Sequence, residues 1–109
     1  MLNQTVLVGR LVKDVEVKAT ETGKKVATVT LAIPRSYKNT EGEYDTDFIQ
    51  CVLWNGVAEN TAEYCHKGDL IGVKGRTESD TYEKDGETHY VTRVVAEKVT
   101  FLSTKKEQE

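Results

Sequence analysis

The amino-acid sequence predicts an all-β domain, a closed barrel of five strands with one short helix between the third and fourth strands. Five segments rich in β-branched residues, each with apolar residues at alternate positions, support this prediction. One stretch between them has helical spacing instead. At 109 residues the chain has room for one hydrophobic core, so we expect the five strands to share it.

The first two strands are predicted over residues 3–12 and 26–33. Gly9 interrupts the first strand, and a glycine within a strand is typical of the bulge or sharp bend that a small barrel needs to close. In the second strand every other residue is apolar. Pro34 follows it and lacks a backbone donor, so we expect it to end regular pairing or to mark a sheet edge.

The third strand, residues 47–54, carries the most informative pattern. One face of it is apolar and is expected to pack on the core. The opposite face begins with Phe48 and ends with Trp54. Two rings on an outward face favour a flat ligand, since such rings stack on unpaired bases. The pattern also fits a strand that is covered on both faces, so this strand alone leaves the two interpretations equal.

The remaining elements complete one chain order. Residues 56–66 have apolar residues at helical spacing and follow Asn55, a residue type that caps helices. The fourth and fifth strands are predicted over residues 70–77 and 90–102. The order of three strands, a helix and two strands is the plan of the OB-fold, a small Greek-key barrel.

Two polar stretches predict hairpin connections between these strands. Residues 38–46 predict a long loop, and residues 78–89 predict a second loop that turns at Asp85-Gly86. The plan accounts for residues 1–103 as one OB-fold domain. It leaves residues 104–109 as a short charged tail.

Composition indicates a soluble globular protein, with 38% hydrophobic and 30% charged residues. No apolar run approaches the ~20 residues that span a bilayer, and the N-terminus lacks a secretory signal. We therefore expect a cytoplasmic protein with no membrane partner. The net charge of −3 is unusual for a nucleic-acid binder, because such proteins are commonly basic.

The sequence contains no motif for catalysis or metal binding. Glycine-rich phosphate loops, the zinc-binding His-Glu-x-x-His pattern and the nucleophile elbow are all missing. Cys51 and Cys65 have no cysteine or histidine cluster beside them, so we expect two buried free thiols. We therefore expect no catalytic residue, no metal and no cofactor.

Rings and cations on strands and hairpins form the pattern that suggests a function. The candidate stacking rings are Tyr37, Phe48, Trp54 and Tyr82, and the candidate phosphate contacts are Arg10, Arg35, Lys74 and Arg76. Stacking is worth ~1–3 kcal/mol per base, and cations neutralise phosphates. Neither contact reads base identity, so the pattern predicts sequence-independent binding of single-stranded DNA. Alternatively, the two tyrosines could only fix hairpins, Trp54 could be a core or interface residue, and Arg10 could serve subunit contacts.

Short blocks along the chain carry a further signal. They are Val6 to Leu11 with Lys13-Asp14, Val29 to Ala32, Asp47 to Ile49 with Val52 to Trp54, Ala58-Glu59 with Tyr64, Lys67-Gly68, Gly75-Arg76, and Val94 to Ala96. In their order and spacing they resemble the bacterial single-stranded DNA-binding protein family. The resemblance implies an OB barrel that forms a homotetramer. We expect the first strand to provide one contact, because it is β-rich and has few charges. The resemblance also implies coating and protection of single-stranded DNA during replication, recombination and repair, with the family's stacking rings at the four aromatic positions named above.

The chain departs from the family pattern at several positions. Val15 stands where a proline is usual, and Glu78 to Thr81 replace a basic approach to Tyr82. Arg93 stands where an acid is frequent. The chain stops at residues 105–109, without the acidic tip through which family members recruit replication and repair proteins, so that recruitment is not implied. Either a longer chain has been truncated or this is a short member.

Two other hypotheses remain open at this stage. An OB-type protein-interaction module, which binds another protein through the same rings, fits the acidic balance of the chain. RNA binding is the third hypothesis, since stacking rings alone do not distinguish the sugar.

Overall fold

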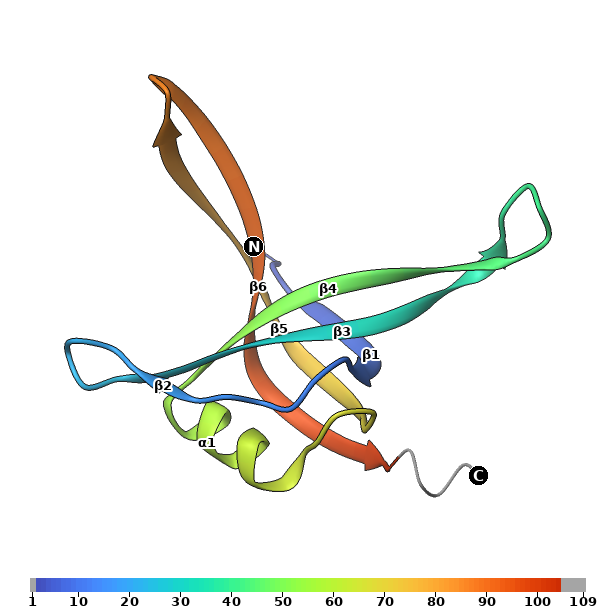
Figure 1. The fold of residues 1–109 in the computed structure, drawn as a ribbon, viewed down its shortest axis with the longest axis horizontal. Coiled ribbons are helices and arrows are strands. Elements are labelled where there is room, and N and C mark those ends of the chain that lie inside the picture. Colours follow the sequence, from blue (N-terminus) through green and yellow to red (C-terminus); the bar gives the residue numbers. More distant parts are fainter. Residues whose placement is uncertain (1, 105–109) are drawn as a thin grey trace.

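The computed structural model describes residues 2–104 and consists of a β-barrel with one helix and two long ribbons (Figure 1). The elements are, in chain order, β1 Thr5–Leu11, β2 Lys18–Ala19, β3 Lys25–Lys38, β4 Tyr44–Trp54, α1 Asn55–Tyr64, β5 Leu70–Lys84 and β6 Glu87–Ser103. The predicted OB-fold class is confirmed. The helix lies between β4 and β5, rather than between strands 3 and 4, because the sequence pattern did not reveal the two-residue strand β2.

Strand pairing closes the barrel. β1 pairs with both β5 and β3, β3 pairs with β4, and β5 pairs with β6, all antiparallel. β4 and β6 meet in a short parallel contact that includes the pair Cys51–Val94. Gly9 allows β1 to approach β3, because a Cβ at this position would lie 2.7 Å from Ile33 Cγ1 and 2.9 Å from the carbonyl oxygen of Ala32.

The hydrophobic core fills the barrel and continues beneath α1. Its largest fully buried side chains are Leu11, Leu31, Leu53, Ile71, Val73 and Cys51. Those on β3, β4 and β5 lie at the alternate positions that the sequence assigned to an apolar face. Both cysteines are buried and free, as predicted. Burial raises the pKa of the Cys51 thiol to about 11, so this thiol is protonated and unreactive at neutral pH.

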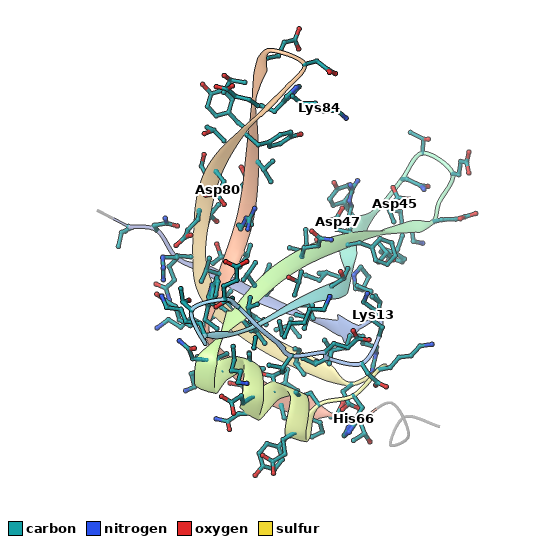
Figure 2. The ribbon with its side chains drawn as sticks, turned by 60° about the vertical axis from the view of Figure 1, so that its left-hand side comes forward. Lys13, Asp45, Asp47, His66, Asp80 and Lys84 are labelled. Atoms are coloured by element: carbon teal, nitrogen blue, oxygen red, sulfur yellow. The ribbon has the colours of Figure 1, made fainter. Side chains whose placement is uncertain are left out.

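Two ribbons extend from the barrel in different directions (Figures 1 and 2). We call residues 34–48 the β3–β4 arm and residues 78–93 the β5–β6 arm. In the first, β3 continues past Pro34 and β4 begins at Tyr44, so the predicted loop 38–46 shrinks to residues 39–43. The register shifts after Pro34, so the proline ends regular pairing without ending the strand.

The second predicted loop, residues 78–89, is almost entirely strand. β5 and β6 pair out to Lys84 and Glu87, and the predicted turn at Asp85-Gly86 is confirmed. Asp85 and Gly86 have φ values of 53° and 78°, which suit a two-residue hairpin turn. An exposed ribbon is polar on both faces, so it lacks the alternation by which a half-buried strand is recognised.

The helix is shorter than predicted, since it ends at Tyr64 and not at His66. Asn55 does not cap it. Trp54 occupies the cap position without a side-chain hydrogen bond, while the Asn55 side-chain oxygen accepts a hydrogen bond from the backbone N–H of Lys25 at 3.2 Å. Among residues 2–104, no helix is long and apolar enough to cross a membrane. Of the predicted tail 104–109, all but Thr104 lies outside the described residues.

Candidate nucleic-acid interface

A groove of about 500 Å³ lies between the outer surface of β3 and β4 and the base of the β5–β6 arm. Its walls are formed by Thr30, Phe48, Ile49, Gln50, Thr77, Thr92, Arg93 and Val94. The lining therefore combines one ring, hydroxyl and amide groups, aliphatic side chains and one cation. We call this feature the groove.

Phe48 is the candidate ring that the structure places in the groove. Alternation along β4 turns it outward, beside Ala32 on the neighbouring strand, and its side chain is 65% exposed. A small cross-strand neighbour leaves the ring uncovered. A phenyl ring held on a strand and open to solvent can stack on a base.

Trp54 lies on the same strand but at a separate position. It is six residues from Phe48, about 20 Å along β4, and is 39% exposed. Val52 lies between the two rings on the same face, yet it is only 8% exposed. The face that the alternation predicts as continuous is therefore divided into two separate ring positions.

Tyr37 and Tyr82 lie far out on the two arms, and both are exposed. The Tyr82 ring stacks on His89 across the β5–β6 arm, with centroids 5.1 Å apart and planes 20° apart. This contact fixes one face of the tyrosine ring and leaves the other open. Within residues 2–104, none of the four candidate rings stacks on another of the four.

Arg35 is bound to acids of its own arm. Its Nη2 and Nε donate to Asp47 Oδ1 at 2.9 and 3.1 Å, and its Nη1 lies 3.8 Å from Asp45 Oδ2. The hydrogen bonds to Asp47 raise the pKa of Arg35 and lower that of Asp47. Figure 2 labels both acids on the β3–β4 arm. Asp47 alternates with Phe48 along β4, so Arg35 is held on the face opposite the Phe48 ring.

Arg76 and Arg10 also use their donors within the chain. Arg76 bonds to Glu78 at 2.7 Å and to Glu97 at 3.1 Å, and these hydrogen bonds raise its pKa, Glu78 having the larger effect. Arg10 Nη1 donates to the carbonyl oxygen of Gly68 at 2.9 Å. That contact ties β1 to the loop after α1, which is a structural role.

Lys74 forms no ion pair within residues 2–104, but it does not line the groove. Its register partners are Val6 on β1 and Lys98 on β6. Thr77, which lines the groove, lies three positions along β5 and so has the opposite strand parity. Of the four predicted phosphate contacts, the structure therefore brings none into the groove.

Arg93 is the groove cation that sequence reasoning did not select. It lines the groove and pairs with Asp80 at 3.0 Å. The signal in the sequence was its place where the family often has an acid. Only the register of β5 against β6 shows that this position reaches the groove.

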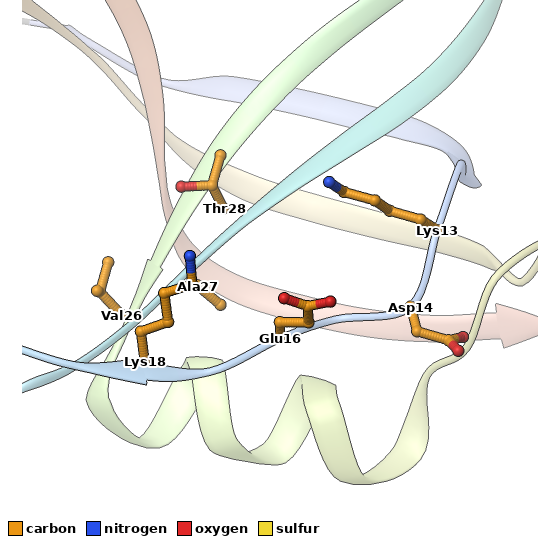
Figure 3. Close-up of a pocket in the computed structure, with 7 residues that line it drawn as sticks. All are labelled: Lys13, Asp14, Glu16, Lys18, Val26, Ala27 and Thr28. Carbon is orange, nitrogen blue, oxygen red and sulfur yellow. The ribbon is translucent and has the colours of Figure 1, made fainter.

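A second hollow, of about 190 Å³, lies beside the Trp54 end of the sheet (Figure 3). Val26, the register partner of Trp54, contributes to its lining. In Figure 3 the amino groups of Lys13 and Lys18 extend toward Thr28 on the outer face of β3. Neither lysine forms an ion pair within the described part of the chain, and the carboxylates of Asp14 and Glu16 line the same hollow.

The arrangement defines a class of protein. The molecule has exposed rings on the β3–β4 surface of an OB barrel, a groove between that surface and the base of the β5–β6 arm, and unpaired lysines beside the sheet. These features suit an extended polymer with flat faces and anionic groups. Within residues 2–104, no group of three or more His, Cys, Asp or Glu side chains could hold a metal ion. The class is therefore an OB-fold binding module of the kind that takes single-stranded nucleic acid.

Comparison with known proteins identifies the family. The sequence profile of the Single-strand binding protein family matches residues 2–102, and the chain belongs to this family. It is 50% identical to the Single-stranded DNA-binding protein B of Bacillus subtilis (strain 168) over 106 residues, which cover 96% of this chain and 94% of that protein.

Two further relatives are longer than this chain. The Single-stranded DNA-binding protein 3 of Listeria innocua is 53% identical over 106 residues, or 96% of this chain and 66% of that protein. A Single-stranded DNA-binding protein of Bacillus cereus is 50% identical over 103 residues, or 94% of this chain and 61% of that protein. The chain thus spans less than two thirds of the length of these two relatives.

Proposed function

We propose that this protein binds single-stranded DNA without sequence preference and coats it during replication, recombination and repair. The observation that carries the proposal is Phe48, a 65% exposed ring in a groove lined with hydroxyl and amide groups. A base stacked on such a ring contributes ~1–3 kcal/mol whatever its identity. Family membership and the names of the relatives support the choice of ligand. The same resemblance supports a cytoplasmic binding protein without enzymatic activity.

Stacking, rather than charge, is the main source of affinity in this proposal. Arg35, Arg76 and Arg93 are all bound to carboxylates of the chain itself. The β5–β6 arm carries five acidic residues, Glu78, Asp80, Glu83, Asp85 and Glu87, and two cations, Lys84 and Arg93. Each phosphate neutralised adds about 0.7 to the slope of log affinity on log salt for single strands. We therefore expect a shallow slope, to which Lys13 and Lys18 contribute.

Fluorescence of Trp54, the only tryptophan, tests the proposal directly. The unaltered protein is titrated with oligo-dT and with duplex DNA of equal length, at low and at high salt. Quenching by oligo-dT alone, only slightly weakened by salt, is the expected result. Oligo-rU in the same assay separates DNA from RNA binding. An absence of binding to any nucleic acid would reject the proposal in favour of a protein-interaction module.

The Phe48→Ala variant tests the groove while leaving the Trp54 reporter in place. Its affinity for oligo-dT should fall by about 5- to 150-fold, the factor that one lost stacking contact represents. Tyr64→Ala is the matched control, because Tyr64 is an equally exposed ring on α1, away from the groove lining. Equal affinities of the two variants for oligo-dT would show that Phe48 is not part of the DNA interface.

We also propose a homotetramer in which β1 provides one contact. The Val6 and Val8 side chains of β1 are 66% and 48% exposed, and Leu102 of β6 is 47% exposed. Within residues 2–104, β1 pairs with β3 only at Arg10 and Leu11, so the rest of that edge has no strand partner. An open edge beside apolar side chains favours pairing with a second copy. Sedimentation should give a tetramer at micromolar concentration, and a monomer would contradict this.

A further inference from the structure

Tyr90 has the most exposed aromatic side chain among residues 2–104, at 77%. It lies on β6 within the β5–β6 arm. Within the described residues its ring has no aromatic or cationic partner, and its hydroxyl has no hydrogen bond. A large ring left uncovered in this way is available to a ligand with a flat face.

The register of the arm connects Tyr90 with the groove. Side chains two positions apart on a strand share a face, so Tyr90 shares one with Thr92 and Val94, both of which line the groove. Arg93, which has the opposite parity, lines the groove as well. Thr77, the register partner of Val94, lines the groove as well. Tyr90 therefore continues the wall of the groove outward, about 7 Å beyond Thr92.

The charge around Tyr90 differs from the charge of the arm as a whole. The three nearest residues on its face are the register partner Thr81 and the neighbours Thr88 and Thr92. Glu78 and Asp80 have the opposite strand parity, where they pair with Arg76 and Arg93. Glu83 is the acid on the Tyr90 face, one step nearer the tip. The Tyr90 face is thus mostly neutral within a strongly acidic arm, and a phosphodiester chain meets little repulsion there.

We propose that Tyr90 is a fifth base-stacking residue, which carries a single-stranded DNA chain from the Phe48 groove out along the β5–β6 arm. The ligand at this position is an unpaired base next to those held in the groove. The inference rests on the proposed function and extends it, since Tyr82, the ring expected on this arm, stacks with His89 on the opposite parity.

A role in folding alone is the competing explanation for Tyr90. Tyrosine favours strands, and a cross-strand pair with Thr81 would stabilise the ribbon. Tyr90→Val keeps a strand-forming side chain but removes the ring, whereas Tyr90→Phe keeps the ring and removes the hydroxyl. The two variants therefore separate strand formation from stacking.

The test measures dissociation constants by fluorescence anisotropy, using labelled oligo-dT from about 4 to about 16 nucleotides. Tyr90→Val should weaken binding of the longer oligonucleotides by about 5- to 150-fold and leave the shortest nearly unchanged, because those fill the groove alone. Tyr90→Phe should bind like the unaltered protein, and so should the control Tyr64→Val. Thermal unfolding and circular dichroism check that each variant is folded.

Two results would overturn the inference while the proposed function stands. One is unchanged binding by Tyr90→Val at every length, and the other is an equal loss in Tyr90→Phe. Failure of the unaltered protein to bind any oligonucleotide would instead overturn the proposed function as well. If Tyr90→Val does not fold, nitration of the unaltered protein decides: oligo-dT should protect Tyr90 and not Tyr64, and equal nitration with and without DNA would refute the role.

Discussion

The β3–β4 arm changes register between Pro34 and Lys38 and ends in a turn of five residues, 39–43. The Asn39 side-chain oxygen holds that turn by accepting hydrogen bonds from the backbone N–H groups of Glu41 and Glu43 at 2.8 and 3.0 Å. The β5–β6 arm instead pairs without a shift from residue 75 to a two-residue turn. One arm is shaped by side-chain contacts and an irregular register, and the other by regular pairing.

The two arms nevertheless have the same arrangement of charged and aromatic residues. Each binds an arginine to an acid of its own, Arg35 to Asp47 and Arg93 to Asp80. Each leaves a tyrosine exposed, Tyr37 on the first arm and Tyr82 on the second. Because both arms hold their arginines in ion pairs and expose their rings, we expect stacking to contribute more to binding than charge does on either arm.

The largest expected effect is a loss of stability caused by a substitution at the base of the β5–β6 arm. A Cβ at Gly75 would collide with the carbonyl oxygen of Val95, where the pairing register shifts. Gly75→Ala should therefore lower the free energy of unfolding by about 3 kcal/mol, measured by urea denaturation. Gly56→Ala is the control, since that Cβ would meet no atom within 4 Å. Equal stability of the two variants would show that the base of the arm is not tightly packed.

The next largest effect is the loss of DNA affinity when the tyrosine ring of each arm is removed. Tyr37→Ala and Tyr82→Ala should each weaken oligo-dT binding by ~1–3 kcal/mol, measured by anisotropy. The loss should be larger for Tyr82, because His89 already holds its ring in place and less ordering is needed on binding. A larger loss of affinity for Tyr37→Ala would mean that the stacking of Tyr82 on His89 does not strengthen DNA binding.

A smaller effect concerns Arg93 and Arg35, the two arginines that are ion-paired within the arms, and the salt dependence of binding. Asp80→Asn frees Arg93, so the slope of log affinity on log salt should steepen by about 0.7. Asp47→Asn releases Arg35 only in part, because its Nη1 still lies 3.8 Å from Asp45 Oδ2. Arg35 is also held on the face away from Phe48, so this variant should change the slope less. Glu59→Gln on the helix makes the same change of net charge without touching an ion pair. Slopes equal to that control in both variants would show that the arginines do not reach phosphate.

The smallest effect is a pH dependence of stability. Arg35 lowers the pKa of Asp47, so the folded state favours the ionised carboxylate. The resulting stabilisation is present above the pKa of the unfolded chain, about 3.9, and is lost as the pH falls through the lowered folded value. Because both groups are exposed, the effect on melting temperature should be slight. Asp47→Asn should flatten this acid limb, and parallel curves for variant and parent would contradict the assignment.

Features that depend on the alternation of apolar and polar residues along a strand could be predicted from the sequence. It places Leu31 and Leu53 in the core and turns Phe48 outward, and the Asp85-Gly86 turn follows from the same local chemistry. Pairing between distant strands could not be predicted. It joins Val52 of β4 to Val95 of β6 and brings Arg93 to the groove.

The arms were predicted as loops for a related reason. A ribbon that is exposed on both faces has no apolar side, so its sequence carries no period of two. The ion pairs of Arg35 and Arg76 depend on register as well, because acids such as Asp47 and Glu97 are distant in sequence from the arginine they bind. Sequence could therefore propose the residue types of the interface, but not which cations are free.

The seam between β4 and β6 has only two residue pairs, Cys51–Val94 and Val52–Val95, which is as few as β1 makes with β3, and it is the parallel junction of the barrel. A junction with so few partners is where local opening should begin, so its amide hydrogens should exchange with solvent sooner than those of the long antiparallel pairings of β3 with β4 and of β5 with β6. Val94 also belongs to the wall of the groove. A strand of DNA lying there would rest on the seam and hold it shut, and the barrel would then be most resistant to unfolding while it carries its ligand.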